Sequence, residues 1–153
     1  GNWLDFRGEE ISEMEESDPV AWCHGAGGIC LSRLALMECA KERRDKLFQE
    51  KILRDVKRAV KKLASQGYRK GMCLCHGSSG NLLILKEYLK YFKDEETEKI
   101  CQKMQMQICS FVWENLMLQE KYNCGIMSGY AGIGIMALQP YGNISGNILS
   151  LGL

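Results

Sequence analysis

The sequence predicts an all-α protein built from repeated helical hairpins. Glycine pairs recur at a fixed spacing of 52 residues, and a period of this size is typical of a repeat architecture. These pairs are Gly25/Gly28, Gly77/Gly80 and Gly129/Gly132. Between them, apolar residues follow the spacing of helices, and no run alternates between apolar and polar residues as a half-buried strand would.

The repeats also divide the chain. They start near positions 22, 74 and 126, and residues 1–21 form an N-terminal segment that leads into the first glycine turn. The third repeat stops at Leu153, after its first helix. Because a short array of hairpins leaves apolar faces exposed at its ends, we expect residues 1–153 to be the C-terminal portion of a larger domain.

The first repeat predicts two helices of different character. The apolar stretch at 29–37 predicts a mostly buried helix that starts at the glycine turn. Residues 46–66 predict a longer amphipathic helix, because apolar side chains recur every three or four positions between Ile52 and Ala64. Gly67 then supplies a signal for the end of this helix.

The later repeats follow the same plan. Residues 81–89 and 133–138 predict further mostly buried helices after their glycine turns. Residues 95–118 predict an amphipathic helix with a regular apolar stripe, and Asp94 is placed to cap its first turn. Pairing one apolar helix with one that has a polar face predicts an inner and an outer layer of helices.

Charge and hydropathy exclude several classes of protein. The chain has 20 basic and 19 acidic residues and a net charge of +1, which argues against a nucleic-acid-binding protein. No apolar run approaches about 18 residues, so no segment is expected to span a membrane, and the N-terminus lacks a signal-peptide pattern. The ten basic residues within 41–62 are interpreted as the solvated face of a helix, with the docking of an acidic peptide or partner as the alternative.

The chain contains eight cysteines, which we expect to be thiols of a cytoplasmic protein rather than disulfides. Five of them lie among apolar residues and are interpreted as small hydrophobic side chains: Cys30, Cys39, Cys101, Cys109 and Cys124. Cys23 and Cys75 differ, because each is followed by His and Gly and the two lie one repeat period apart. Both histidines of the chain, His24 and His76, fall in these Cys-His-Gly triplets.

The Cys-His-Gly triplets predict a metal site. If neighbouring repeats stack in register, Cys23, Cys75 and His76 converge at one end of the array. Thiolate and imidazole donors together suit Zn²⁺, and three protein ligands leave a fourth position open, as in catalytic sites. Two alternatives stay open: His24 closes the site as a fourth ligand, or the triplets are buried turns that bind no metal.

Three segments resemble those of the lanthionine synthetase C-like cyclases: WCHGAGGI at 22–29, LCHGSSGN at 74–81 and GIMSGYAGIG at 125–134. The opening NWLDFR and the final NILSLGL make the chain most similar to the C-terminal end of the bifunctional class II lanthipeptide synthetases. The resemblance implies an α/α toroid, a double-layered barrel of helical hairpins with a single Zn²⁺. By position, Cys23, Cys75 and His76 are then its ligands.

The resemblance also implies an activity. A cyclase of this family adds the cysteine thiols of a dehydrated lanthipeptide precursor to dehydroalanine or dehydrobutyrine, which closes thioether rings in the bacterial cytoplasm. The family's main catalytic His and Asp belong to upstream motifs that this chain does not contain, so the implied partners are the precursor peptide and the rest of the synthetase. We therefore expect the isolated chain to be inactive. His24 stands where relatives carry His or Tyr and is the candidate catalytic residue of this segment.

Two other functions are compatible with the sequence. One is that of a lanthionine synthetase C-like enzyme that adds glutathione to dehydrated residues. The other is that of a non-catalytic helical binding scaffold stabilised by zinc, for which we expect a closed four-ligand site that includes His24. An upstream dehydratase domain in the full reading frame would favour ring formation over both.

Overall fold

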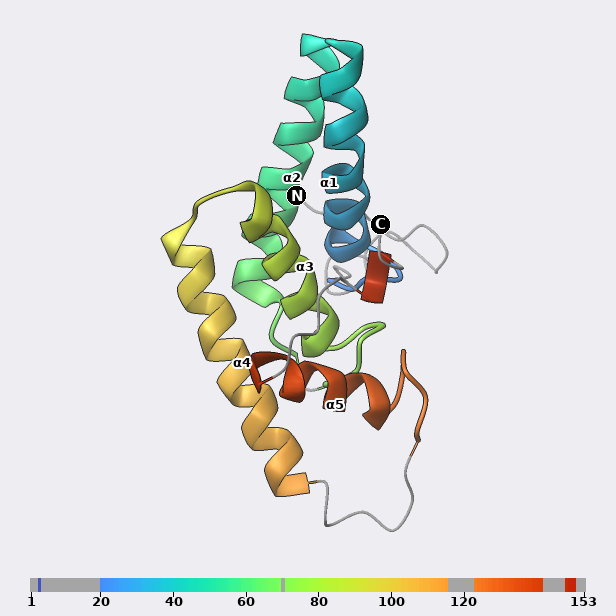
Figure 1. Ribbon diagram of the computed structural model, residues 1–153, viewed down its shortest axis with the longest axis vertical. Helices are drawn as coiled ribbons and strands as arrows, with labels where there is room; N and C mark the ends of the chain where they lie inside the picture. The colour runs from blue at the N-terminus through green and yellow to red at the C-terminus, as the bar shows by residue number, and fades with distance from the viewer. Residues whose placement is uncertain (1–2, 4–19, 70, 116–122, 142–147, 151–153) are drawn as a thin grey trace, which may run out of the picture.

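The computed structural model describes residues 3, 20–69, 71–115, 123–141 and 148–150, and over these residues the protein is all-α, as the sequence predicts (Figure 1). Its helices are α1 (Ala26–Arg43), α2 (Lys46–Gln66), α3 (Ser78–Tyr91), α4 (Glu95–Asn115) and α5 (Tyr130–Leu138), followed by the short 3-10 helices η1 (Gln139–Tyr141) and η2 (Ile148–Ser150). The extended pairing found in this part of the chain is a single antiparallel bridge between Val20 and Gly25.

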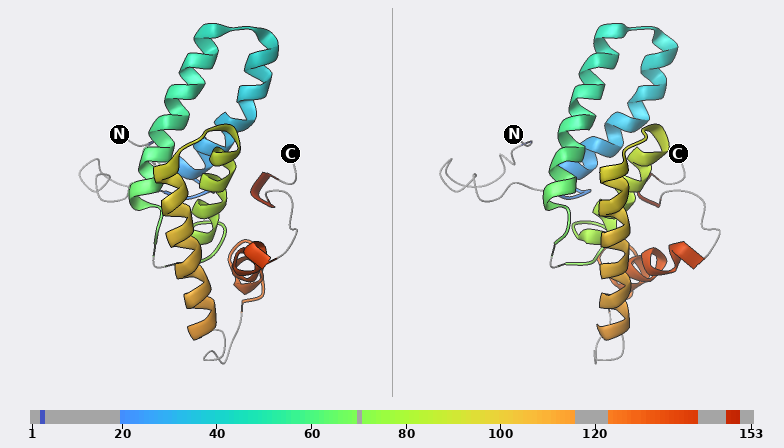
Figure 2. Two further views of the ribbon diagram at one scale, coloured as in Figure 1. Left: turned by 60° about the vertical axis from the view of Figure 1, so that its left-hand side comes forward. Right: turned by 90° about the vertical axis from the view of Figure 1, so that its left-hand side faces the viewer.

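The helices form two antiparallel hairpins and one further helix. α1 packs on α2, and α3 packs on α4, while α5 lies across the lower end of the second hairpin (Figure 1). The two further views show the same order, with the α1–α2 hairpin extending beyond the rest of the molecule (Figure 2). α3 is the centre of the array, because it contacts α1, α2, α4 and α5.

Burial of the first helix of each repeat follows this arrangement. α3 is buried on nearly all sides, from Ser78 to Leu85, which confirms the expectation for 81–89. The same expectation is wrong for 29–37, where one face of α1 stays exposed. In 133–138, Leu138 at the end of α5 is exposed, at 61%, and the residues before it are buried or half-buried. The reason is position in the array. α3 has a neighbouring repeat on each side, whereas α1 and α5, at the two ends of the described array, each have a neighbouring repeat on one side.

The outer helices agree closely with their predicted boundaries. α2 spans the predicted residues, and its apolar stripe, from Ile52 to Leu63, is buried. α4 begins after Asp94 as predicted and is described to Asn115, so the predicted residues 116–118 lie outside the described part of the chain. Of the N-terminal segment 1–21, the structure describes Trp3, Val20 and Ala21.

Gly67 ends α2 for a different reason from the one predicted. A helix-stopping glycine usually adopts a left-handed conformation, but Gly67 has φ −69° and ψ −21°, which any residue can adopt. Its N–H donates to the carbonyl of Leu63 at 2.7 Å. A Cβ at this position would overlap that carbonyl oxygen, so close approach of the backbone is what requires glycine here.

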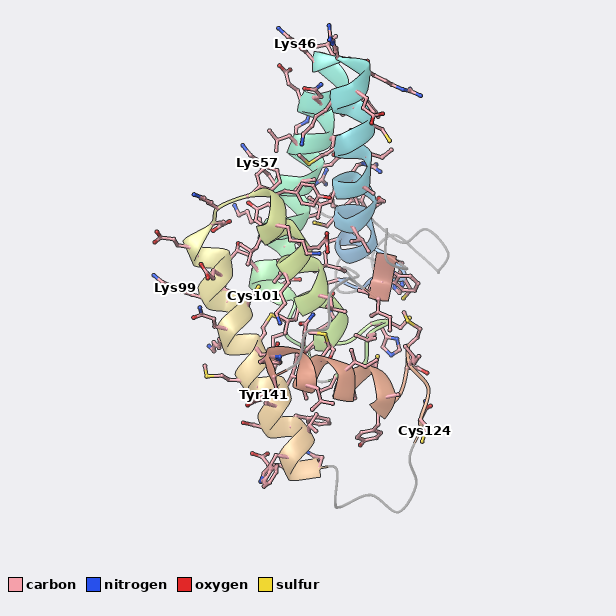
Figure 3. The ribbon with its side chains drawn as sticks, in the orientation of Figure 1. Lys46, Lys57, Lys99, Cys101, Cys124 and Tyr141 are labelled. Atoms are coloured by element: carbon pink, nitrogen blue, oxygen red, sulfur yellow. The ribbon has the colours of Figure 1, made fainter. Side chains whose placement is uncertain are left out.

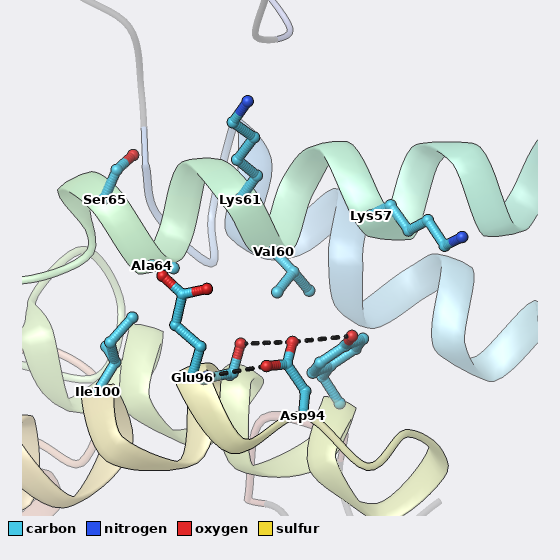
Figure 4. Close-up of a pocket in the computed structure, with 10 residues that line it drawn as sticks. Lys57, Val60, Lys61, Ala64, Ser65, Asp94, Glu96 and Ile100 are labelled. Atoms are coloured by element: carbon cyan, nitrogen blue, oxygen red, sulfur yellow. Dashed lines mark hydrogen bonds between the residues drawn. The ribbon is translucent and has the colours of Figure 1, made fainter.

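The basic block at 41–62 is confirmed as a solvated face. Lys46 and Lys57 project from α2 away from the core and are exposed (Figure 3). A groove of about 490 Å³ runs between α2 and α4, with Lys57 and Lys61 on the α2 side and Asp94 and Glu96 on the α4 side (Figure 4). This groove therefore carries both signs of charge. None of the helices that the structure describes has the length and apolar character needed to cross a membrane.

Asp94 caps α4 as predicted. One carboxylate oxygen accepts the backbone N–H of Thr97 at 3.0 Å, and the other accepts the hydroxyls of Thr97 at 2.9 Å and Tyr88 at 3.3 Å (Figure 4). These hydrogen bonds, above all those from Thr97, hold the pKa of Asp94 below its ordinary value. The cap is therefore strongest when the carboxyl group is ionised.

We expect Asp94→Ala to lower the free energy of unfolding by about 1 kcal/mol at neutral pH, because the first turn of α4 loses its cap. Since the pKa is lowered by folding, this stabilisation is complete above the unfolded-state pKa of about 4 and is lost as the pH falls through the folded-state value. Asp94→Asn is the matched control, because it retains a cap and loses the titration. Thermal unfolding at several pH values measures both effects, and equal stability of the Ala variant and the wild type would contradict the cap.

Candidate metal centre

Backbone hydrogen bonds join the glycine turns of the three repeats. The N–H groups of Trp22 and Cys23 donate to the carbonyl of Cys75 at 3.1 and 3.4 Å. The N–H of Cys75 in turn donates to the carbonyl of Met127 at 2.8 Å. Positions 23, 75 and 127 are equivalent in the 52-residue repeat, so the repeats stack in register and their turns cluster, as predicted.

The second glycine of each pair makes this stacking possible. In every repeat it packs against the carbonyl oxygen of the residue six positions earlier, closer than any real Cβ would allow. The pairs are Gly28 with Trp22, Gly80 with Leu74, and Gly132 with Ile126. The helix that follows each turn can therefore start directly beneath the loop that carries the candidate ligands.

The structure brings the side chains of Cys23, His24 and Cys75 together. The sulfur of Cys23 lies 3.2 Å from Nδ1 of His24. Cys75 is partly buried, and burial raises its pKa to about 11, together with a hydrogen bond between its thiol and Cys23 and the negative charges that Cys23 and Cys73 carry when ionised. Thiols from two repeats therefore share one polar site, and their ionised forms repel each other in the absence of a cation.

His76 lies on the wall of an open depression beside these thiols. The depression has a volume of about 830 Å³, and His24 also lines it. Its other lining residues are Val20, Ala21, Gln66, Tyr68, Arg69 and Gly71. His76 is exposed and follows Cys75 directly, so rotation of its side chain moves the imidazole over this surface without a change in the backbone.

The predicted ligand set stays a prediction. Within the described residues, no group of three or more His, Cys, Asp or Glu side chains is placed so that it could hold a metal ion. Cys23 and Cys75 meet, whereas the imidazole in contact with Cys23 is that of His24. The donor chemistry fits Zn²⁺, because two thiols and two imidazoles gather at one end of the helices and a divalent cation would offset the repulsion between thiolates.

The other cysteines differ in how deeply they are buried. Burial raises the pKa of Cys30 to about 12 and that of Cys101 to about 11, so both stay protonated and serve as small hydrophobic side chains, as predicted. Cys109 is partly buried, and its sulfur donates to the carbonyl of Ala137 at 3.8 Å. The same interpretation is wrong for Cys39 and Cys124, which are exposed: Cys39 lies on the outer face of α1, and Cys124 lies in a loop whose residues 123–126 are all exposed. None of the eight cysteines forms a disulfide.

Arg69 was not identified from the sequence. It lines the depression, and its backbone is held in place by Ser78, whose hydroxyl accepts the N–H of Arg69 at 2.8 Å and donates to its carbonyl at 2.9 Å. A basic residue in a loop is usually solvated, so no local signal distinguishes Arg69. Its place beside His24 and His76 follows from the tertiary structure alone.

Similarity to known proteins indicates the family of this chain. The family model described as lanthionine synthetase C-like protein matches residues 1–148, which include all three glycine turns. The lacticin 481/lactococcin biosynthesis protein LcnDR2 of Lactococcus lactis subsp. lactis is 29% identical over 140 residues, which is 86% of this chain and 15% of that relative. No solved structure matches the chain. The chain belongs to the lanthionine synthetase C-like protein family.

Proposed function

We propose that the protein containing this chain is a zinc-dependent cyclase that closes thioether rings in a dehydrated lanthipeptide precursor. The observation that supports this most is the contact between Cys23, His24 and Cys75 at stacked glycine turns, within residues that match the family. The relative named for lacticin 481 biosynthesis supports a peptide substrate of this class. Because the chain spans 15% of that relative, the activity is proposed for the whole protein.

In this proposal, Cys23, Cys75 and His76 hold the ion. When bound, Zn²⁺ acts as a Lewis acid that lowers the pKa of a coordinated thiol, so that a peptide cysteine is available as thiolate near neutral pH. The depression of about 830 Å³ is the size of a ligand pocket, and its open mouth suits a peptide segment.

His24 would move the proton in this reaction. The peptide S–H adds across the double bond of the dehydro residue: a C–S bond forms at the β-carbon, and the α-carbon takes up a proton, with no change in overall oxidation state. Nδ1 of His24 is engaged with the sulfur of Cys23, which leaves Nε2 to carry a proton toward the α-carbon. His24 also lines the depression, as this role requires.

Mass spectrometry after thiol alkylation tests the proposed function. A dehydrated precursor is incubated with the full-length protein, and each closed ring removes one alkylatable thiol. We expect zinc-dependent protection by the full-length protein and none above the uncatalysed rate by the isolated chain of 153 residues, because positioning of the dehydro residue needs the rest of the protein. Thiols that stay alkylatable with the zinc-loaded full-length protein would contradict the proposal, and peptide adducts with added glutathione would favour the glutathione alternative.

We expect His24→Asn to keep one equivalent of zinc and to slow ring closure by about 100-fold, the usual contribution of a general acid. His24→Tyr is the matched control, since tyrosine retains a proton donor, and it should lose less activity. Zinc content by metal analysis and ring closure by alkylation are measured on the same samples. Loss of zinc in both variants would instead support a closed four-ligand site that contains His24.

A further inference from the structure

We propose that Asn81 is a positioning residue that holds the Cys23 turn in register with the Cys75 turn. Asn81 lies in the first turn of α3 and is fully buried. Its importance for metal binding rests on the proposed function, whereas its effect on the register of the two turns stands independently.

Asn81 joins three segments that are distant in the sequence. Its Nδ2 donates to the carbonyl of Val20 at 3.0 Å and to the carbonyl of Gly67 at 2.9 Å. Both amide hydrogens are used, and this fixes the orientation of the side chain. The contact spans 61 residues to Val20 and 14 residues to Gly67.

The Val20 contact holds the loop that carries Cys23 and His24. Val20 forms a bridge with Gly25, and the N–H of Ala21 donates to the carbonyl of His24 at 3.2 Å. Because these bonds connect the two ends of the loop 20–25, a hydrogen bond that fixes Val20 restrains the whole loop. α3 starts just after the Cys75 turn. Through Asn81, the Cys23 turn is therefore bonded to the helix that follows the Cys75 turn.

The repeat itself marks Asn81 as unusual. The equivalent positions in the first and third repeats are Ile29 and Ile133. The same backbone hydrogen bond forms in the first two repeats, since the N–H of Ile29 donates to the carbonyl of Gly25 at 3.2 Å and the N–H of Asn81 donates to the carbonyl of Gly77 at 3.3 Å. A buried amide where the repeat holds Ile is unfavourable unless it is paired. Here Nδ2 of Asn81 pairs with two backbone carbonyls, whereas its Oδ1 is buried without a hydrogen-bond partner among the described residues.

The direct bonds between the turns need this support. The bonds from Trp22 and Cys23 to the Cys75 carbonyl, at 3.1 and 3.4 Å, share one acceptor and are longer than the 2.8 Å bond from Cys75 to Met127. The bond from Cys23 is longer than the ordinary range, and it shares its acceptor with the bond from Trp22. Asn81 adds two bonds of ordinary length in the buried core, each to its own acceptor.

The test compares Asn81→Asp and Asn81→Ile with Ile108→Ala in the full-length protein. Asn81→Asp keeps the shape and leaves at most one donor, the O–H of a protonated carboxyl group, where the amide has two. Asn81→Ile introduces the residue that the other repeats hold, so the backbone tolerates it. Ile108 is a buried core residue of α4, and its truncation lowers stability without touching the turns. Amide hydrogen exchange at Trp22 and Cys23 is measured with zinc affinity by chelator competition.

We expect exchange at Trp22 and Cys23 to become faster, and zinc affinity to fall about 10- to 100-fold, in both Asn81 variants and not in Ile108→Ala. Unchanged exchange in Asn81→Ile, or equal acceleration in Ile108→Ala, would overturn the proposal. If the wild-type protein binds no zinc, the proposed function fails, but the exchange comparison still decides the role of Asn81.

Discussion

Replacing Cys75 with alanine is expected to abolish stoichiometric zinc binding and ring closure together. The side chain of Cys75 contacts Cys23, but the bonds that stack the turns use its backbone N–H and carbonyl. Alanine keeps both backbone groups, so the stacking of the turns survives and only the sulfur is lost. A three-ligand site that loses one ligand no longer holds its metal tightly.

The expected loss of activity is on the order of 1,000-fold or more, because an unassisted thiol with a pKa near 8.5 is only a few per cent thiolate at neutral pH and positioning is lost as well. Cys109→Ala is the matched control, since Cys109 is a partly buried thiol on α4 that bonds to Ala137 and lies outside the turns. Metal analysis and alkylation of a dehydrated precursor are the measurements. A Cys75→Ala protein that keeps one zinc and full activity would show that the ligand assignment is wrong.

Gly80→Ala is expected to destabilise the fold by about 3 kcal/mol, among the largest effects available to a single methyl group. The new Cβ would overlap the carbonyl oxygen of Leu74, and a backbone atom cannot turn aside as a flexible side chain can. Leu74 is fully buried and directly precedes Cys75, so any shift also displaces the candidate ligand.

Gly134→Ala in α5 is the contrasting variant. A Cβ at Gly134 meets no atom within 4 Å, so alanine should stabilise the helix by up to about 1 kcal/mol through its higher helix propensity. Thermal unfolding of both variants and of the wild type gives the comparison. If Gly80→Ala and Gly134→Ala shift the melting temperature in the same direction by similar amounts, close packing at the glycine turn is not what requires Gly80.

Much of this fold could be predicted because its determinants are local. The apolar period of 46–66 locates α2 at its observed bounds, and Asp94 caps α4, because periodicity and capping depend on residues within a few positions of one another. The 52-residue period also predicted that the turns carrying Cys23 and Cys75 lie side by side, since equivalent positions of stacked repeats meet.

Other features depend on which neighbours each segment acquires, and these required the tertiary structure. Lys86 shows this well: its Nζ donates to Oε1 of Gln105 and of Gln139, both at 2.7 Å, and so links α3 to α4 and η1, while burial lowers its pKa. From the sequence, a lysine on a helix indicates a solvated side chain.

The same distinction between local and tertiary determinants applies to the candidate site. The sequence by itself determined the repeat, the all-α class and the stacked turns, because helical period and glycine spacing depend on residues at fixed separations along the chain. Its assignment of Cys23 and Cys75 as sulfur donors stays a prediction. Only the tertiary structure decided that His24 contacts Cys23, that Arg69 joins the two histidines at one depression, and that Asn81 anchors Val20 and Gly67. The physical reason is that these contacts join a side chain to a group that is distant in the sequence and becomes its neighbour through packing. Short-range sequence patterns do not predict which distant groups become neighbours.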